Sequence, residues 1–105
     1  MNGRLGKVEA GVLNFVPLYT PGVGVNHSVV NVLVCNTNST EVAITIAIST
    51  TVSPSPNDYI ESAYVLPANG HLERTALVIS GDESVLVYAS GPGVICRAHG
   101  FEKSA

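Results

Sequence analysis

The strict alternation of residues 41–49 is the strongest constraint on what this chain can form. Every even position in this segment is a large aliphatic residue, and every odd position is small or polar. A period of two indicates a β-strand with one buried face. Residues 28–35 are nearly continuous in apolar side chains, which is typical of a strand covered on both faces. The polar segment 36–39 lies between them, so we predict that the two strands pair as a hairpin.

The remaining chain is divided by Gly and Pro too often for long helices. After a proline-containing loop at 50–58, strands are predicted at 59–66, 71–79, 84–89 and 94–101, joined by tight turns as a C-terminal four-strand meander. One or two further strands are expected within residues 8–19. About seven short strands at this spacing predict an all-β fold, a single antiparallel β-sandwich of jelly-roll or Ig-like type.

The chain has 105 residues, the size of one domain with its own hydrophobic core. We assign residues 8–101 to the sandwich domain. Residues 1–7 are expected to form an N-terminal arm and residues 102–105 a C-terminal tail, both mobile unless a neighbour holds them.

The charge composition limits the classes of partner. Lys and Arg number 5 against 8 Asp and Glu, and charged residues make up only 12% of the chain. A net charge of -3 argues against electrostatic binding of nucleic acid, and no apolar run is long enough to span a membrane. Nor do the first residues resemble a secretory signal. A weakly charged surface favours assembly into something larger, although a neutral monomer has the same composition.

No motif in the sequence indicates catalysis. His27, His71 and His99 are not spaced as metal ligands, and no pair of carboxylates is placed as an acid and a base. A nucleophile elbow is absent, and Gly22-Val23-Gly24 lacks the strand-to-helix context of a dinucleotide-binding loop. We therefore predict a protein that is not an enzyme and that has no catalytic, cofactor-binding or metal-binding residues.

The two cysteines lie in separate apolar segments. Cys35 and Cys96 lack the spacing of a zinc site. We predict two buried free thiols, since free Cys in apolar strands behaves as a small hydrophobic residue. A disulfide between them remains the alternative.

Charged residues within the predicted strands suggest subunit contacts. Glu73 and Arg74 lie in one strand, and Arg97 and His99 lie two strands later, where they could face the first pair across the sheet. An exposed ion pair and a contact between subunits are both open interpretations. The predicted edge strands contain few Lys residues to protect them from pairing with another chain. The candidate contact residues are Ser53, Pro54, Asp58, Glu73, Arg74, Arg97 and His99.

The C-terminal half contains the stretch P-A-N-G-x-L-E-R-T within residues 66–78. Mainly through this stretch, it resembles a family of small virion structural proteins of tailed bacteriophages. The other segments that contribute are residues 58–61, 81–83, 85–90 and 94–102.

This resemblance implies a protein without catalytic residues that is made in the host cytoplasm and incorporated into the virion. It implies most directly a capsid decoration, or cement, protein that binds the major capsid protein and copies of itself, with a trimer as one possible assembly. The alternative is a β-sandwich module of a tail or fibre that binds a receptor or glycan. Such a module needs a concave aromatic patch or an acidic calcium loop, and the sequence indicates neither.

Overall fold

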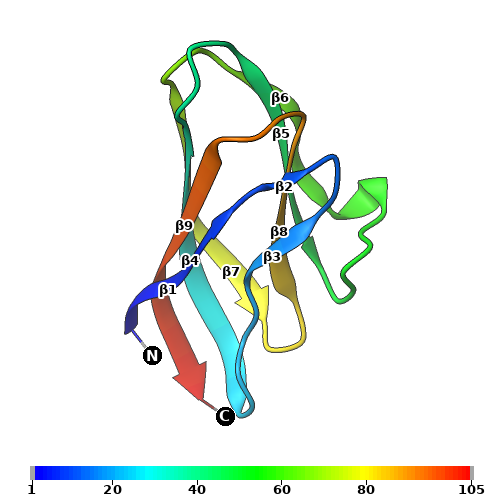
Figure 1. The fold of residues 1–105 in the computed structure, drawn as a ribbon. Helices are drawn as coiled ribbons and strands as arrows, with labels where there is room; N and C mark the ends of the chain where they lie inside the picture. Colours follow the sequence, from blue (N-terminus) through cyan, green and yellow to red (C-terminus); the bar gives the residue numbers. More distant parts are fainter. Residues whose placement is uncertain (1, 105) are drawn as a thin grey trace.

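The computed structural model describes residues 2–104 and consists of two β-sheets packed face to face (Figure 1). This confirms the predicted all-β sandwich, which within these residues has nine strands instead of about seven and a single 3-10 turn, η1 (Pro56–Asp58). The strands are β1 (Asn2–Glu9), β2 (Gly11–Val12), β3 (Val16–Tyr19), β4 (Val25–Asn36), β5 (Val42–Ser49), β6 (Tyr59–Leu66), β7 (His71–Ser80), β8 (Ser84–Ala89) and β9 (Val94–Ser104).

The sheets are mostly antiparallel. Sheet A has the strand order β1-β9-β4-β7. Sheet B has the order β2-β8-β5-β6, with β3 also paired to β8, and its β2–β8 pair is parallel. The core lies between the two sheets, and each fully buried aliphatic side chain in it stabilises the fold by about 1.5–3 kcal/mol before the loss of chain entropy is counted. Its fully buried side chains include Val30, Val32, Val34, Ile44, Ile46, Leu66, Ile79, Val85 and Val94.

The predicted hairpin between residues 28–35 and 41–49 is wrong, because β4 lies in sheet A and β5 in sheet B. The segment that joins them is held by the buried side chain of Asn36. Its Nδ2 donates to the carbonyl oxygens of Thr40 at 2.9 Å and Pro67 at 3.1 Å. Its Oδ1 accepts from the backbone N–H and from the side-chain amide of Asn38, both at 3.0 Å. These bonds fix the segment against the β6–β7 turn, so the chain crosses between the sheets.

The predicted C-terminal meander is also wrong. β6 pairs with β5 and β8 pairs with β5 in sheet B, whereas β7 and β9 both pair with β4 in sheet A. The turns lie where they were predicted, but each crosses between the sheets. Because strands are about 4.8 Å apart within a sheet and sheets are about 10 Å apart, a short polar turn can make either connection.

The exposure of β4 and β5 is the reverse of the prediction. In β5 the outward residues Thr45, Ala47 and Ser49 are buried, as are the inward residues Val42, Ile44 and Ile46. In β4 the inward residues are buried, but the outward side chains of Val29 and Leu33 are half-exposed. The strand that was expected to be covered on both faces therefore has one open face.

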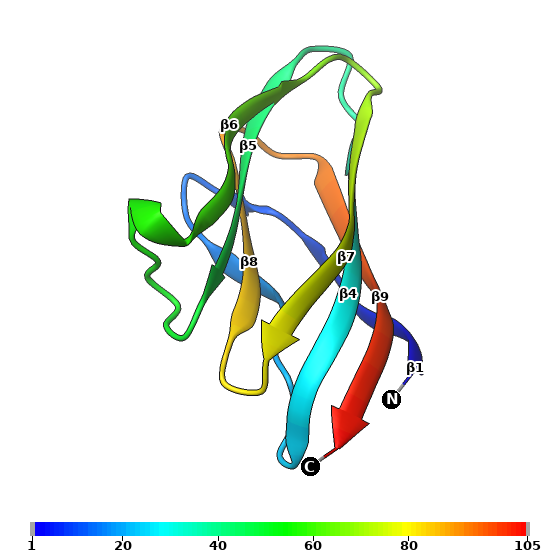
Figure 2. The same cartoon turned by 180° about the vertical axis from the view of Figure 1, so that it is seen from behind.

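The predicted terminal arms are strands in this structure. Residues 2–7 belong to β1 and residues 102–104 belong to β9, while residues 1 and 105 lie outside the described part. β1 pairs antiparallel with β9, so that Lys7 lies opposite Arg97. The two ends of the described part of the chain consequently lie in neighbouring strands, as both views show (Figures 1 and 2). Each expected arm is held by a neighbouring strand of the same chain.

The edge strands are interrupted by irregularities, and Lys7 of β1 is the one lysine that they contain. The register of β1 shifts around Leu5, and that of β3 shifts after Pro17, which has no N–H to donate. β6 and β7 contain irregularities at Ala63 and Ala76, where φ is positive. Bulges and proline hinder the pairing of an edge with another chain. Addition of a strand from another subunit is thus disfavoured at each of these edges.

The two irregularities in β6 and β7 are held in the same way. The N–H of Ala63 donates to Thr45 Oγ1 at 3.0 Å, and the N–H of Ala76 donates to Asn31 Oδ1 at 2.8 Å. In each case a polar side chain of the neighbouring inner strand replaces the missing ladder bond. These hydrogen bonds hold Ala63 and Ala76 in the left-handed backbone conformation, which costs an L residue about 1–2 kcal/mol.

Replacing Ala76 by glycine should therefore raise the free energy of unfolding by about 0.5–1 kcal/mol, because the relief of strain exceeds the added entropy of the unfolded chain. Thermal unfolding followed by circular dichroism would measure the change. Ala89→Gly is the control, since Ala89 is buried in β8 without a positive φ, and this variant should lose stability. A loss of stability in Ala76→Gly would contradict the prediction.

Candidate functional site

The outer face of sheet A is the part of the molecule most open to a partner. Alternate residues of a strand point to the same side, so the register between strands determines which side chains share this face. We call it the sheet A face. Its members are Arg4, Lys7 and Glu9 of β1; Ile95, Arg97, His99, Phe101 and Lys103 of β9; His27, Val29, Asn31, Leu33 and Cys35 of β4; and His71, Glu73, Val78 and Ser80 of β7.

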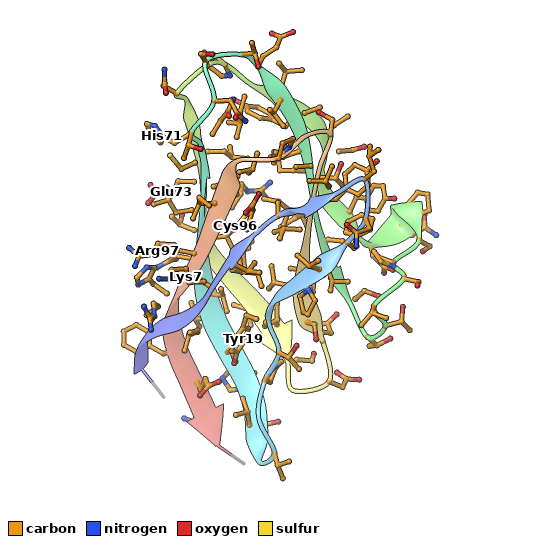
Figure 3. The ribbon with its side chains drawn as sticks, viewed as in Figure 1. Lys7, Tyr19, His71, Glu73, Cys96 and Arg97 are labelled. Carbon is orange, nitrogen blue, oxygen red and sulfur yellow. The ribbon has the colours of Figure 1, made fainter. Side chains whose placement is uncertain are left out.

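The side chains of the sheet A face form rows that run across the strands. Arg97 and Glu73 project away from sheet B, and Cys96 points toward the interior (Figure 3). The rows are Phe101–Val29–Val78, then Lys7–Arg97–Leu33–Glu73, then Ile95–Cys35–His71.

Four of the five Lys and Arg residues lie on the sheet A face. They are exposed, and within residues 2–104 none forms an ion pair or a side-chain hydrogen bond. The fifth, Arg74, points to the other side of β7, donating to Glu61 Oε1 at 2.6 Å and to the carbonyl oxygen of Ile60 at 3.0 Å. This bond links the edges of the two sheets. The four unpaired cations are Arg4, Lys7, Arg97 and Lys103.

Most of the carboxylates, in contrast, form hydrogen bonds within the fold. Five of the eight accept a hydrogen bond from the chain itself, and only Glu73 and Glu9 lie on the same side of sheet A as the cations. A chain with a net charge of -3 therefore presents a locally positive face. The engaged carboxylates are Glu9 with Gly93 N–H, Asp58 with Ser55 N–H, Glu61 with Arg74, Glu83 with Ser80 N–H and Glu102 with Tyr19.

A buried tyrosine connects three strands below this face. The hydroxyl of Tyr19 in β3 donates to Glu102 Oε2 of β9 at 2.6 Å and lies 2.7 Å from Ser28 Oγ of β4. Burial, together with the hydrogen bond to Glu102, raises the pKa of Tyr19 to about 12. The phenol therefore stays neutral near pH 7 and links the strands through its hydroxyl.

The candidate contact residues fall into separate parts of the structure. Glu73, Arg97 and His99 share the sheet A face, although β4 lies between the first two. Arg74 is directed to sheet B and bonded there. The remaining three, Ser53, Pro54 and Asp58, lie in the β5–β6 loop and η1, in the other half of the sandwich (Figure 1).

Sequence reasoning missed two features of the surface. Arg4 and Lys7 of β1 lie beside the basic residues of β9 and enlarge the positive surface. They were missed because residues 1–7 were expected to form an arm. The alternation of Ile95, Arg97 and His99 along β9 was the available signal in the sequence. An aromatic cluster was missed as well. Phe15 of the β2–β3 loop lies 5.7 Å from the ring of Tyr59 and 5.2 Å from that of Tyr88. Its rings come from three distant segments, so no local pattern indicates it.

The two cysteines are free thiols on opposite sides of sheet A. Cys96 pairs with Val34, and Cys35 pairs with Ile95, so neighbouring positions direct one sulfur into the core and the other outward. The alternative of an intrachain disulfide is therefore excluded by geometry. Burial was correctly predicted for Cys96 only, because Cys35 is half-exposed.

The two thiols should differ strongly in reactivity. Burial raises the pKa of the Cys96 thiol to about 12, so both access and thiolate formation are suppressed there. In dilute native protein, one thiol per chain should react rapidly with a disulfide reagent, and two should react in denaturant. Alkylation followed by peptide mass spectrometry would identify the reactive residue as Cys35. Rapid modification of Cys96 in the native protein would contradict this structure.

Further features bear on the other function classes. Among residues 2–104, no three His, Cys, Asp or Glu side chains are grouped closely enough to hold a metal ion. The described chain contains no helix with the length and apolar character needed to cross a membrane. In comparisons with known proteins, no protein-family model matches this chain, and no curated protein matches its sequence at a significant level.

Proposed function

We propose that this chain is a non-enzymatic structural protein of a tailed bacteriophage virion, most simply a capsid decoration protein that binds the major capsid protein. The single observation that supports it best is the set of unpaired cations on the sheet A face of a chain whose net charge is negative. The resemblance of residues 66–78 to small virion structural proteins supports the same assignment.

The physical basis of docking is electrostatic and geometric. Arg4 and Lys7 extend from an edge strand of a sheet, so their positions are fixed by the β1–β9 ladder. An acidic patch on a shell subunit would attract them and determine the orientation of binding. The interrupted edge strands favour docking through these side chains over strand addition.

The test is quantitative mass spectrometry of purified virions, with the copy number of this protein referenced to the major capsid protein. A ratio near one copy per capsid subunit is expected. In addition, shells that lack the protein should bind the wild type, and the double variant Arg4→Glu/Lys7→Glu should bind at least about tenfold more weakly, since two charge contacts are reversed. Absence of the protein from the particle would overturn the proposal.

A tail or fibre module that binds a receptor or glycan is the second candidate. The half-buried cluster of Phe15, Tyr59 and Tyr88 favours it, since aromatic rings can stack on sugar rings. A glycan screen would support this function if it detects binding that Tyr59→Ala abolishes. A virion copy number of only a few to a few dozen would favour it over decoration of the shell.

A further inference from the structure

The outer side of β4 is an apolar strand surface that its own chain leaves open. Val29, Leu33 and Cys35 are half-exposed there, and the flanking Phe101 and Val78 are 64% and 68% exposed. The corresponding side of β5 is buried. A central strand with a nearly continuous apolar sequence is normally covered on both faces. Phe and Arg side chains are also enriched in protein interfaces.

The side chains on this surface lie in pairs, with one member on each side of β4. Arg97 in β9 and Glu73 in β7 are both in register with Leu33, one on each side of it. They are about 10 Å apart, twice the strand spacing. Within residues 2–104 neither has an ion-pair partner. Phe101 and Val78 lie in the same way on the two sides of Val29.

We propose that a second copy of this chain covers the surface, with sheet A face packed on sheet A face and a two-fold axis running along β4. Rotation about this axis places β9 of one copy over β7 of the other. Arg97 of each copy then meets Glu73 of its partner, so two equivalent ion pairs form across the interface. Packed sheets adopt such aligned arrangements at a spacing of about 10 Å. The interface is isologous, as in most homodimers.

The same rotation brings like apolar residues together. Val29, Leu33 and Cys35 lie near the axis and face their own counterparts, while Phe101 faces Val78. β1 has no counterpart on the far side of β4, since β7 is the other edge. The side chains of Arg4 and Lys7 therefore remain at the two rims of the dimer. In the dimer Arg97 is paired with Glu73 of the other copy, so docking to the shell would use the rim cations Arg4 and Lys7.

The experiment is sedimentation equilibrium of the full chain and its charge variants. The wild type should be a dimer. Arg97→Glu and Glu73→Arg should each weaken dimerisation by about 100-fold or more, because like charges then face each other twice. The double variant Arg97→Glu/Glu73→Arg should restore the dissociation constant to within about tenfold of the wild type, since the pairs form again with exchanged signs.

Arg4→Glu is the matched control, because it reverses a cation of β1 that lies outside the overlap and opposite His99 instead of Arg97, and it should leave dimerisation unchanged. A monomeric or trimeric wild type would overturn the proposal, as would a double variant that stays monomeric when circular dichroism shows it to be folded. The virion copy number does not enter this test, so the dimer and the proposed function can fail separately.

Alkylation of Cys35 provides a second readout that locates the interface. Its rate should fall as the protein concentration rises through the dissociation constant of the wild type, because Cys35 lies near the axis. The rate in Arg97→Glu should not depend on concentration. A dimer in which Cys35 keeps its full reactivity would place the interface elsewhere and overturn the proposal.

Discussion

Replacing Asn36 by leucine should lower the free energy of unfolding by about 3 kcal/mol, among the largest effects expected for one substitution in this chain. The side chain is fully buried, and its amide makes four bonds of 3.1 Å or less, to Thr40, Pro67 and Asn38. Leucine has a similar size but leaves these polar groups without their partner. The measurement is the urea concentration at the unfolding midpoint. It is compared between proteins whose free energy of unfolding depends equally steeply on the urea concentration.

The control for this variant is Asn26→Leu, which makes the same replacement at an exposed position of the same strand. Its stability should change by no more than about 0.5 kcal/mol, the usual limit for surface sites. If the two variants unfold at the same urea concentration, the Asn36 network does not hold the crossover between the sheets.

Gly100→Ala should be as damaging, with a loss of about 3 kcal/mol or failure to fold. Gly100 lies in β9 opposite Val30, at a φ of +156°, and a Cβ there would collide with the carbonyl oxygen of Val29. Both partners are backbone in the middle of sheet A, so neither can move without breaking the ladder. Thermal unfolding and soluble yield would measure the effect.

The comparison is Gly22→Ala, at a position where an added Cβ meets nothing and φ is not positive. That variant should be neutral or more stable by up to about 1 kcal/mol, because alanine restricts the unfolded chain. Equal stability of Gly100→Ala and the wild type would show that β9 does not approach β4 as closely as described.

Local patterns were sufficient for the strands and turns but not for their pairing. The alternation of residues 41–49 and the turn residues at 67–70, 80–83 and 90–93 correctly indicated where strands begin and end. Which sheet each strand joins depends on contacts between distant residues. The bond from Asn36 to Pro67 is an example, since 31 positions separate them in the sequence.

The candidate site was predictable in part for the same reason. Arg97, His99 and Glu73 lie on one side of sheet A, as the alternation of side chains along each strand allows, although the meander from which they were expected to face each other does not form. Arg74 was also a candidate contact residue, but its side chain is bonded to Glu61 in the other sheet. Arg4 and Lys7 were missed because their strand forms only by pairing with β9, about 90 residues later.

The pairing of β1 with β9 has a consequence for how the protein is made. β9 is the last strand of the fold to be synthesised, yet it lies between β1 and β4 in sheet A. Until it leaves the ribosome, β1 has no ladder partner and β4 lacks one of its two. Only β5 and β6 are both consecutive and paired among the described strands. Proteins with such non-local topologies fold in milliseconds to seconds. The apolar strands of the nascent chain therefore stay exposed to solvent until β9 is released.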